Sequence, residues 1–278
     1  MGIHRCAVKA SAAIAVAAWI AGCRPTEPPP PTEVVTIHPS LAGVTVVLDP
    51  GHGGEDTGAV RAGVCEATVN YRMASTLANV LRARGASVVF TVTSDTLGGA
   101  ADPRANEPPL VRPRDARLVW NGMPVRLRPD SSPDDLYRRA AIVRRCLSER
   151  TPSGPILFLA LHCDELGHNK GRGARVYFDR RSGSPCRLAL ILKRRLTDAG
   201  LTNSPGGRVI PRAYGVLNPH YNVATECVLV EMATLSDARD RNSVKQRSWR
   251  LRLATLLADG ITECCDSRTS PERIATAS

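Results

Sequence analysis

The stretch Val44-Thr-Val-Val-Leu-Asp-Pro-Gly-His-Gly-Gly54 joins a short apolar run to a glycine-rich loop. Residues 44–48 have the β-branched composition of a buried strand, which ends where Asp49-Pro50-Gly51 favours a turn. His52 follows directly in that loop. Ligand sites in open α/β sheets lie beyond the carboxyl ends of the strands, so this loop is a candidate site. It is not a phosphate-binding P-loop, because no Gly-Lys-Ser/Thr follows the glycines.

Patterns typical of helices and strands alternate along the chain on either side of this stretch. Residues 66–84 carry apolar side chains at a spacing of four, and Gly85 ends the predicted helix. This alternation predicts a single α/β domain over residues 41–266, with a mainly parallel sheet and helices on both faces. The sequence predicts further strands at 87–93, 156–161, 175–178 and 227–230, and further helices at 136–147, 186–199 and 249–264.

The first 22 residues have the layout of a secretory signal, with a basic head before an apolar stretch too short to span a bilayer. Ile20-Ala-Gly-Cys23 resembles the lipobox of bacterial lipoproteins, which implies lipidation at Cys23. A plain secretory signal or an N-terminal anchor helix are the alternatives. Residues 23–40 are rich in proline, which favours an extended spacer, and we expect residues 267–278 to form a flexible tail.

The predicted location follows from this N-terminus. Arg24 is not the aspartate that retains lipoproteins at an inner membrane. We therefore expect the protein in the cell envelope, lipid-anchored at the periplasmic face of the outer membrane.

The chain is strongly basic, with 37 Lys+Arg against 26 Asp+Glu and a net charge of +11. Such a surface suits an anionic partner such as a nucleic acid, lipid headgroups or a cell-wall polymer, although a solvated arginine-rich face is an equal alternative. Aromatic residues make up only 4% of the chain, and none is interleaved with a basic run. Because there is little to stack bases on, we expect no nucleic-acid partner.

Chemically reactive side chains follow three of the predicted strands. His162 and Glu231 each come directly after a strand, His52 lies in the loop after the first strand, and Glu66 begins the helix that follows that loop. The carboxyl ends of parallel strands share one edge of a sheet, so these four side chains can converge there. Two imidazoles and a carboxylate are the ligand set of a catalytic Zn²⁺ that keeps one position open for water.

Four motifs follow one another along the chain, namely VVLDPGHGGEDTGA (46–59), Glu66 with Asn70 in the next helix, ALHCD (160–164) and VLVE (228–231). They resemble those of the zinc-dependent N-acetylmuramoyl-L-alanine amidases of the amidase-3 family. The resemblance implies that His52, Glu66 and His162 bind Zn²⁺ and that Glu231 is the catalytic carboxylate. It also implies cleavage of the amide between N-acetylmuramic acid and L-alanine in peptidoglycan, and leaves open the need for a protein activator.

The chain departs from the family pattern within ALHCD and after VLVE. Asp164 stands where the family has an asparagine and adds negative charge near the predicted metal, where it could contact substrate. The segment after VLVE keeps only the Ser236-Asp237 portion of the family's turn. Two alternatives therefore stay open, namely a non-catalytic peptidoglycan-binding lipoprotein and a metallohydrolase of a different amide on the same fold.

Two further features have structural and functional interpretations. Cys65 and Cys163 flank predicted ligands, which suggests either a disulfide between them or a Cys–His nucleophile. Adjacent residues of a strand point to opposite faces, so we expect Cys163 to face away from the site of His162. Residues 96–135 hold seven prolines and no periodicity. We expect this insertion either to contact the cell wall or a partner or to gate the cleft, and a tolerated surface insertion without a function is an equal alternative.

Overall fold

The computed structural model of the protein describes residues 40–94, 117–120, 123–126, 133–149, 154–165, 171–202 and 208–269. The predicted signal peptide, Cys23 and almost all of the proline-rich linker lie outside the described residues, as does most of the 96–135 insertion. None of the helices in the described ranges combines the length and the apolar character needed to span a lipid bilayer.

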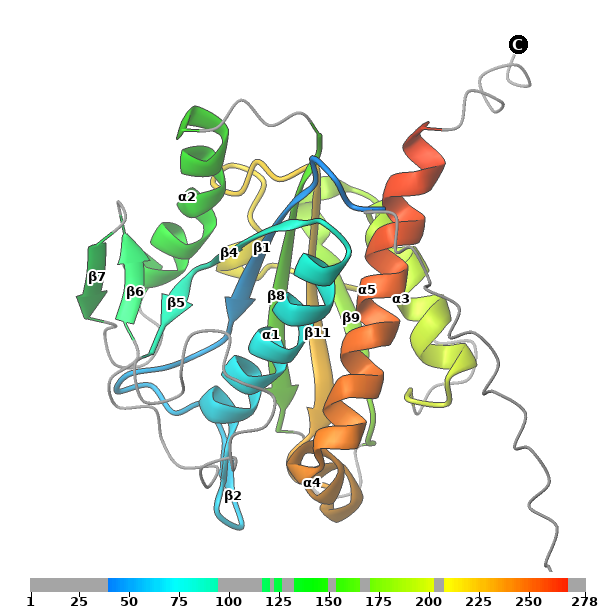
Figure 1. The fold of residues 1–278 in the computed structure, drawn as a ribbon. Coiled ribbons are helices and arrows are strands. Elements are labelled where there is room, and N and C mark those ends of the chain that lie inside the picture. Colours follow the sequence, from blue (N-terminus) through cyan, green and yellow to red (C-terminus); the bar gives the residue numbers. More distant parts are fainter. Residues whose placement is uncertain are drawn as a thin grey trace, which may run out of the picture. The chain divides into compact units, whose positions relative to one another are not determined.

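The centre of the described chain is a sheet with the strand order β10-β9-β11-β8-β1-β4. Strands β1, β4, β8 and β11 run parallel, whereas β9 runs antiparallel to β11 and β10 runs parallel to β9. The prediction of a mainly parallel sheet is therefore confirmed. The arrowheads of β1, β8 and β11 lie at the same end of the sheet (Figure 1). The strands are β1 (Thr45–Pro50), β4 (Ser87–Phe90), β8 (Ile156–Asp164), β9 (Arg175–Asp179), β10 (Ile210–Arg212) and β11 (Glu226–Thr234).

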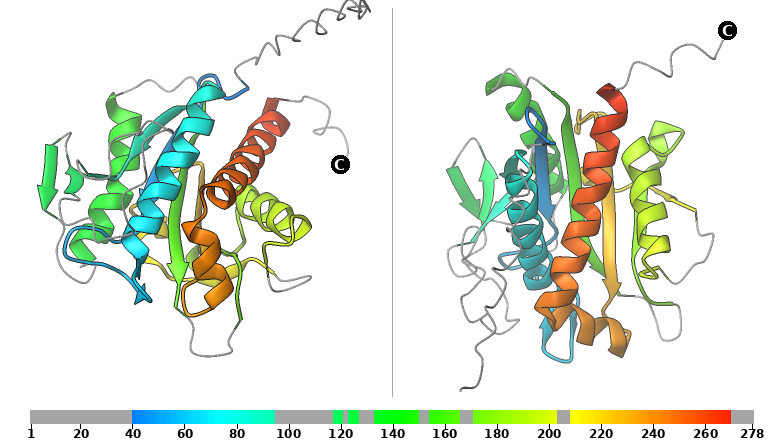
Figure 2. Two further views of the ribbon diagram at one scale, coloured as in Figure 1. Left: turned by 60° about the horizontal axis from the view of Figure 1, so that its bottom comes forward. Right: turned by 45° about the vertical axis from the view of Figure 1, so that its right-hand side comes forward.

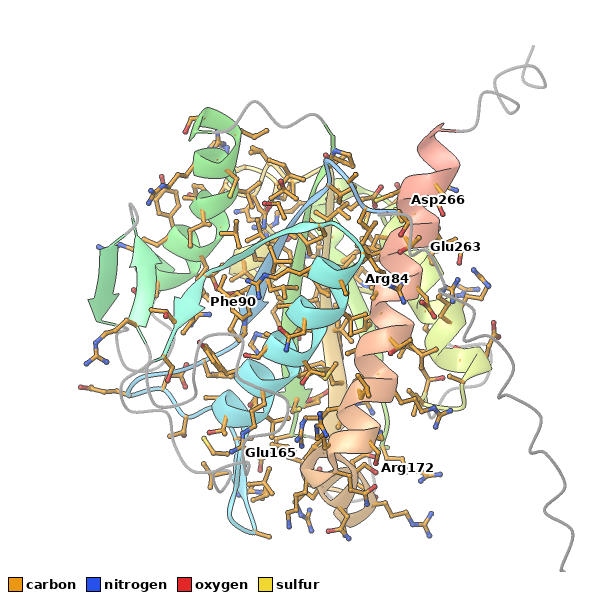
Figure 3. All side chains as sticks on the ribbon, viewed as in Figure 1. Arg84, Phe90, Glu165, Arg172, Glu263 and Asp266 are labelled. Carbon is orange, nitrogen blue, oxygen red and sulfur yellow. The ribbon has the colours of Figure 1, made fainter. Side chains whose placement is uncertain are left out.

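Helices cover both faces of this sheet, as predicted (Figure 2). The helices α1 (Glu66–Ala83), α3 (Arg187–Asp198) and α5 (Arg247–Thr269) pack on one face, and α2 (Pro133–Glu149) packs on the other. In Figure 3 the side chain of Arg84, just after α1, lies beside α5, and its Nη2 is 2.6 Å from Oδ1 of Asp259.

The strands alternate between the two apolar cores. In β8, Leu157, Leu159 and Leu161 pack on the side of α1 and α5, whereas Phe158 and Ala160 pack on the side of α2. Each fully buried side chain of this size stabilises the fold by about 1.5–3 kcal/mol. Because the side-chain period of a strand is two, His162 falls on the α2 side. Glu231 of β11 pairs in register with His162, so it lies on the same side.

The strand predicted at 87–93 is divided in two. Strand β4 ends at Phe90, and β5 (Val92–Thr93) leaves the central sheet to pair with β6 (Arg117–Trp120), which pairs with β7 (Met123–Arg126). The division lies at Thr91, whose hydroxyl donates a hydrogen bond to the Asp49 carboxylate. Strands β6 and β7 fall in the insertion, where runs of four residues are too short to leave a periodic pattern.

Several short elements and boundaries escaped the sequence patterns. The β2 (Val60–Arg61) and β3 (Val64–Cys65) hairpin and α4 (Ala238–Lys245) were not predicted. Helix α2 begins at Pro133, before the predicted start at Leu136. Helix α5 continues to Thr269, so the first three residues of the predicted tail are helical, and residues 270–278 lie outside the described part.

Candidate metal centre and active site

The loop after β1 holds His52 in an uncommon backbone conformation. The φ angle of His52 is 65°, and Gly53 and Gly54 follow with φ angles of 121° and 58°. A left-handed conformation costs a residue that bears a side chain about 1–2 kcal/mol. Contacts from the rest of the fold must therefore keep His52 in place.

Gly51 is required because the ring of His162 occupies the space where its side chain would be. A Cβ atom at Gly51 would lie 2.1 Å from Cε1 and 2.2 Å from Nε2 of His162. Gly58 has the same role on the other side of the site, since its Cβ would lie 2.5 Å from Oε2 of Glu66 and 2.6 Å from Cδ2 of His52. The glycines of the motif thus let the backbone approach the functional side chains closely.

Three of the side chains predicted as ligands come together at the carboxyl end of the sheet. Oε1 of Glu66 lies 3.0 Å from Nε2 of His52 and 3.2 Å from Nδ1 of His162. The rings of the two histidines are 4.9 Å apart at an angle of 75°. The candidate ligand atoms all lie within 4.8 Å of one another.

The carboxylate of Glu66 is held by backbone and side-chain donors. Its Oε2 accepts a hydrogen bond from the Ala59 amide at 2.9 Å, and its Oε1 accepts one from the Cys163 amide at 3.1 Å. Asn70, one helical turn later, donates to the same Oε1 at 3.3 Å and also to the carbonyl of Gly51 at 3.2 Å. These donors fix the carboxylate in the direction of the two histidines.

Asp56 orients His52 from behind, a role that the sequence analysis missed. Its Oδ2 lies 2.8 Å from Nδ1 of His52, and its Oδ1 accepts a hydrogen bond from the Gly58 amide at 3.0 Å. A carboxylate on the second ring nitrogen of a metal-binding histidine fixes the tautomer and the ring orientation. The sequence feature that could have indicated this role is the position of Asp56, four residues after His52 in the same loop.

The protonation of these groups depends on their ion pairs. Burial lowers the pKa of His52, but hydrogen bonds to Asp56 and Glu66 outweigh that effect and raise its pKa to about 10. Burial raises the pKa of Glu66, but the hydrogen bonds from His162 and His52 dominate and hold that pKa well below its usual range. A positive charge on His52 is therefore balanced by the ionised carboxylate of Glu66.

The arrangement fits a Zn²⁺ ion. Ligand distances of about 2.0–2.2 Å place tetrahedral ligand atoms roughly 3.3 Å apart, close to the 3.0 and 3.2 Å from Glu66 to the two imidazoles. Two imidazole nitrogens and one carboxylate oxygen also match the donor preference of zinc. The role of His52, Glu66 and His162 as ligands stays a prediction that this geometry supports.

Glu231 lies beside this cluster with one unpaired oxygen. Its side chain is buried, at 8% exposure, and its Oε2 has no hydrogen-bond partner within the described residues. Burial, together with the negative charges of Glu66 and Asp164, raises the pKa of Glu231 well above its usual range. A buried carboxylate without a full set of partners is a costly feature, and it suits a group that exchanges protons with a ligand.

A pocket opens beside this cluster on the α2 side of the sheet. Its walls combine the polar groups of the site with apolar side chains from α2 and from the segment before β11. No motif or periodic pattern in the sequence marks the wall residues Leu136, Tyr214 and Val216 as part of a site. The pocket is lined by Asp49, Gly51, His52, Leu136, Arg139, His162, Tyr214, Gly215, Val216, Leu229 and Glu231.

Asp164 has a cationic partner. Nη1 of Arg175 lies 3.3 Å from Oδ2 of Asp164 and donates to Oγ1 of Thr234 at 3.1 Å. Burial raises the pKa of Asp164 despite this arginine. The extra negative charge of the ALHCD motif is thus offset by Arg175 on β9. The next residue, Glu165, forms an ion pair with Arg61 of the β2–β3 hairpin. Figure 3 shows Glu165 at the end of the molecule where this hairpin lies.

The two cysteines beside the cluster are free thiols, so the predicted Cys65–Cys163 disulfide is wrong. Cys65 donates to the carbonyl of Thr57 across 3.4 Å. Cys163 is buried in the core on the side of α1 and α5, as strand alternation predicted. Burial and the charges of Glu66 and Glu231 raise the pKa of its thiol well above the usual range, which excludes it as the nucleophile.

Glu226, a second carboxylate on β11 that lies at the start of the strand, has a structural role at α3. Its Oε2 accepts a hydrogen bond from the amide of Leu188 at 3.0 Å, in the first turn of α3. It therefore stabilises the N-terminus of that helix.

Comparison with known sequences gives a consistent result over most of the chain. A family model described as N-acetylmuramoyl-L-alanine amidase (Amidase_3) matches residues 46–263. The chain is 22% identical over 231 residues to the germination-specific N-acetylmuramoyl-L-alanine amidase of Bacillus subtilis (strain 168). That match covers 83% of this chain and 84% of the relative.

Solved structures with the same fold include two amidases. The CwlD amidase from Clostridioides difficile, solved in complex with the GerS lipoprotein, is 17% identical with a TM-score of 0.56. The catalytic domain of CwlV from Bacillus (Paenibacillus) polymyxa var. colistinus is 23% identical with a TM-score of 0.54. Each match covers 80% of this chain and 98% of the other. At these identities the structures bear on the fold alone.

Proposed function

The chain belongs to the Amidase_3 family of N-acetylmuramoyl-L-alanine amidases, and on that premise we propose a zinc-dependent reaction at the cluster of His52, Glu66 and His162. The substrate is peptidoglycan, and the bond cleaved is the amide between the lactyl group of N-acetylmuramic acid and L-alanine. The observation that carries the proposal is the convergence of these three side chains beside Glu231, whose Oε2 has no partner in the described part of the fold.

His52, Glu66 and His162 hold the metal in this proposal, and Asp56 orients His52. When bound, Zn²⁺ acts as a Lewis acid toward the amide carbonyl and lowers the pKa of a water molecule to about 7. The chain prepares the site in advance, because backbone amides of Ala59 and Cys163 already hold the Glu66 carboxylate. Zinc binding requires both imidazoles in their neutral form, so the proton on His52 must be released.

Glu231 moves the proton in this reaction. Its carboxylate accepts a proton from the attacking water and delivers it to the nitrogen of L-alanine as the carbon–nitrogen bond breaks. Without that proton the amine is a very poor leaving group. In the metal-free protein, burial and neighbouring negative charge raise the pKa of Glu231 above its usual range, a direction that favours uptake of a proton by this carboxylate.

The pocket wall suits the junction between sugar and peptide. Leu136, Tyr214, Val216 and Leu229 present apolar surface beside Glu231. The atoms around the scissile amide are uncharged and carry the methyl groups of the lactyl and alanyl units. Packing of those methyl groups on this wall would exclude bulk water from the reacting amide.

Peptidoglycan lies outside the cytoplasm, which agrees with the signal sequence predicted for residues 1–22. We propose export and lipidation at Cys23, with the proline-rich linker spacing the catalytic domain from the membrane. Expression of the full chain with an alkyne-tagged fatty acid tests this proposal. Wild type is expected to incorporate the label and Cys23→Ser is not, whereas equal labelling of the two would refute the anchor.

The reaction is tested by incubating the purified full chain with intact peptidoglycan. Zinc content is measured first, and the soluble products are then identified by mass spectrometry. We expect one Zn²⁺ per chain and released stem peptides that begin with L-alanine. A Glu231→Gln chain should keep the metal and release none.

Other outcomes separate the alternatives. Zinc without products from the purified chain would favour an activator-dependent enzyme or a hydrolase of a different amide. Peptidoglycan binding with neither zinc nor products would favour the non-catalytic wall-binding lipoprotein. Products released by the purified chain without a second protein would show that no activator is required.

A further inference from the structure

A buried arginine on α2 contacts the backbone of the metal loop. The side chain of Arg139 is only 3% exposed, although it is charged and comes from the helix that covers the opposite side of the pocket. Its Nη2 donates a hydrogen bond to the carbonyl of His52 at 2.8 Å, and its Nη1 donates to the carbonyl of Pro50 at 2.9 Å. Nη1 also lies 2.8 Å from Oδ1 of Asp49.

These contacts act where the backbone needs support. His52 has a φ angle of 65°, a conformation that costs about 1–2 kcal/mol for a residue with a side chain. Two peptide carbonyls of this turn, those of Pro50 and His52, accept from one guanidinium group. The strained turn is therefore held from a separate element rather than by the loop alone.

Asp49 in turn holds the arginine. It is fully buried at the end of β1, and its Oδ1 also accepts a hydrogen bond from the Thr91 hydroxyl. A planar guanidinium with five donors can serve a carboxylate and two carbonyls at once, whereas a lysine ammonium is a point charge on a flexible stem. The geometry selects arginine at this position.

We propose that Arg139 is a positioning residue that holds the backbone of His52, so that Nε2 of this histidine faces Glu66 and His162. The inference rests on the proposed function, because it assigns His52 to the metal. Arg139 bonds to Asp49 and to the carbonyls of Pro50 and His52, so of the three candidate ligands it is His52 whose backbone it holds. Removing it should lower zinc affinity without removing a ligand.

The test compares three full-length chains, Arg139→Lys, Arg139→Met and the matched control Arg138→Met. Arg138 is the neighbouring residue on α2, and its Nη1 lies 3.8 Å from Oδ1 of Asp135. Zinc dissociation constants are measured by competition with a chromophoric chelator. Loss of a side chain that supports a metal ligand lowers metal affinity by about 10–100-fold, and we expect a loss of that size for Arg139→Met. The zinc affinity of Arg139→Lys should lie between those of Arg139→Met and wild type. The control Arg138→Met should bind zinc as wild type does.

A spectroscopic readout separates positioning from a merely structural role. Cobalt(II) replaces zinc in such sites, and its visible absorption bands depend on ligand geometry. We expect Arg139→Lys to shift or weaken these bands relative to wild type, while Arg138→Met leaves them unchanged. A role confined to fold stability would lower the melting temperature of the metal-free chain and leave the cobalt bands as they are.

Removing Arg139 alone leaves the Asp49 carboxylate buried and unpaired, which can prevent folding. The double variant Asp49→Asn/Arg139→Met removes both charges, and the asparagine oxygen can still accept from Thr91. We expect this chain to fold and to bind zinc at least about tenfold more weakly than wild type. The single variant Asp49→Asn keeps the arginine bonds to Pro50 and His52 and should bind zinc better than the double variant.

The inference is overturned if the folded Arg139 variants and the double variant bind zinc and cobalt as wild type does. It is also overturned if Arg138→Met loses as much affinity as Arg139→Met. Failure of the proposed function has a different signature, since a wild-type chain that binds zinc but releases no stem peptides would point to an activator-dependent enzyme or a hydrolase of a different amide and leave these affinity comparisons intact.

Discussion

Substitution of Gly51 by alanine tests whether the close approach of the loop to His162 is essential. The backbone of Gly51 is not in the left-handed region, so alanine introduces no φ strain there. The added methyl group would instead lie 2.1 Å from Cε1 of His162. The perturbation is therefore a single steric conflict between one carbon atom and one candidate ligand.

The size of the effect follows from that distance. Ordinary van der Waals contact begins at 3.4 Å, so the ring must move by about 1.3 Å from its place beside Glu66. Zinc–nitrogen distances tolerate only about 0.2 Å of variation. The side chain of His162 is 19% exposed and can swing outward. We therefore expect zinc affinity to fall at least about tenfold and amide cleavage about a hundredfold, with little loss of fold stability.

Zinc competition titrations, peptidoglycan cleavage and thermal unfolding of the metal-free chain measure these three quantities. Gly63→Ala is the matched control, because Gly63 has a φ angle of 76° and a methyl group added there would meet no described atom within 4 Å. That control should lose about 1 kcal/mol of stability from backbone strain and keep its zinc. A Gly51→Ala chain that binds zinc as tightly as wild type would refute the reasoning.

Three further predictions concern charges around the site. Glu231→Gln should keep its zinc and lose about 10²–10⁴-fold in cleavage rate; unchanged turnover would remove Glu231 from the mechanism. The raised pKa of His52, about 10, stabilises the metal-free fold fully below pH 6.5, and this contribution is lost as pH rises through 10. Zinc binding at pH 8 should therefore release about one proton from His52. Calorimetry in buffers of different ionisation enthalpy measures this number, and a result of no proton released would contradict the pairing of His52 with Asp56 and Glu66. Asp164→Asn should change zinc affinity by less than about threefold, because Arg175 offsets this carboxylate; a larger loss would place Asp164 at the metal.

Local sequence patterns were sufficient for the main elements of the fold and for the candidate ligands. Each helix or strand leaves a pattern of apolar residues in its own stretch of sequence. Such patterns are visible at 44–48, 66–84 and 156–161. Because parallel strands share an edge, the same patterns placed His52, His162 and Glu231 together. The motif around His52 then indicated the family.

The contacts that complete the site were decided by tertiary packing. Arg139 and Asp49 are 90 residues apart, and no local pattern couples them. The break of the predicted strand at Thr91, the antiparallel course of β9 and the partnership of Asp164 with Arg175 depend likewise on side chains from separate elements.

The physical reason lies in the range of the interactions. Periodicity and turn preferences arise from neighbours along the chain, so one sequence reveals them. A buried guanidinium, or a glycine beneath an imidazole, is selected by atoms that only folding brings within a few ångströms.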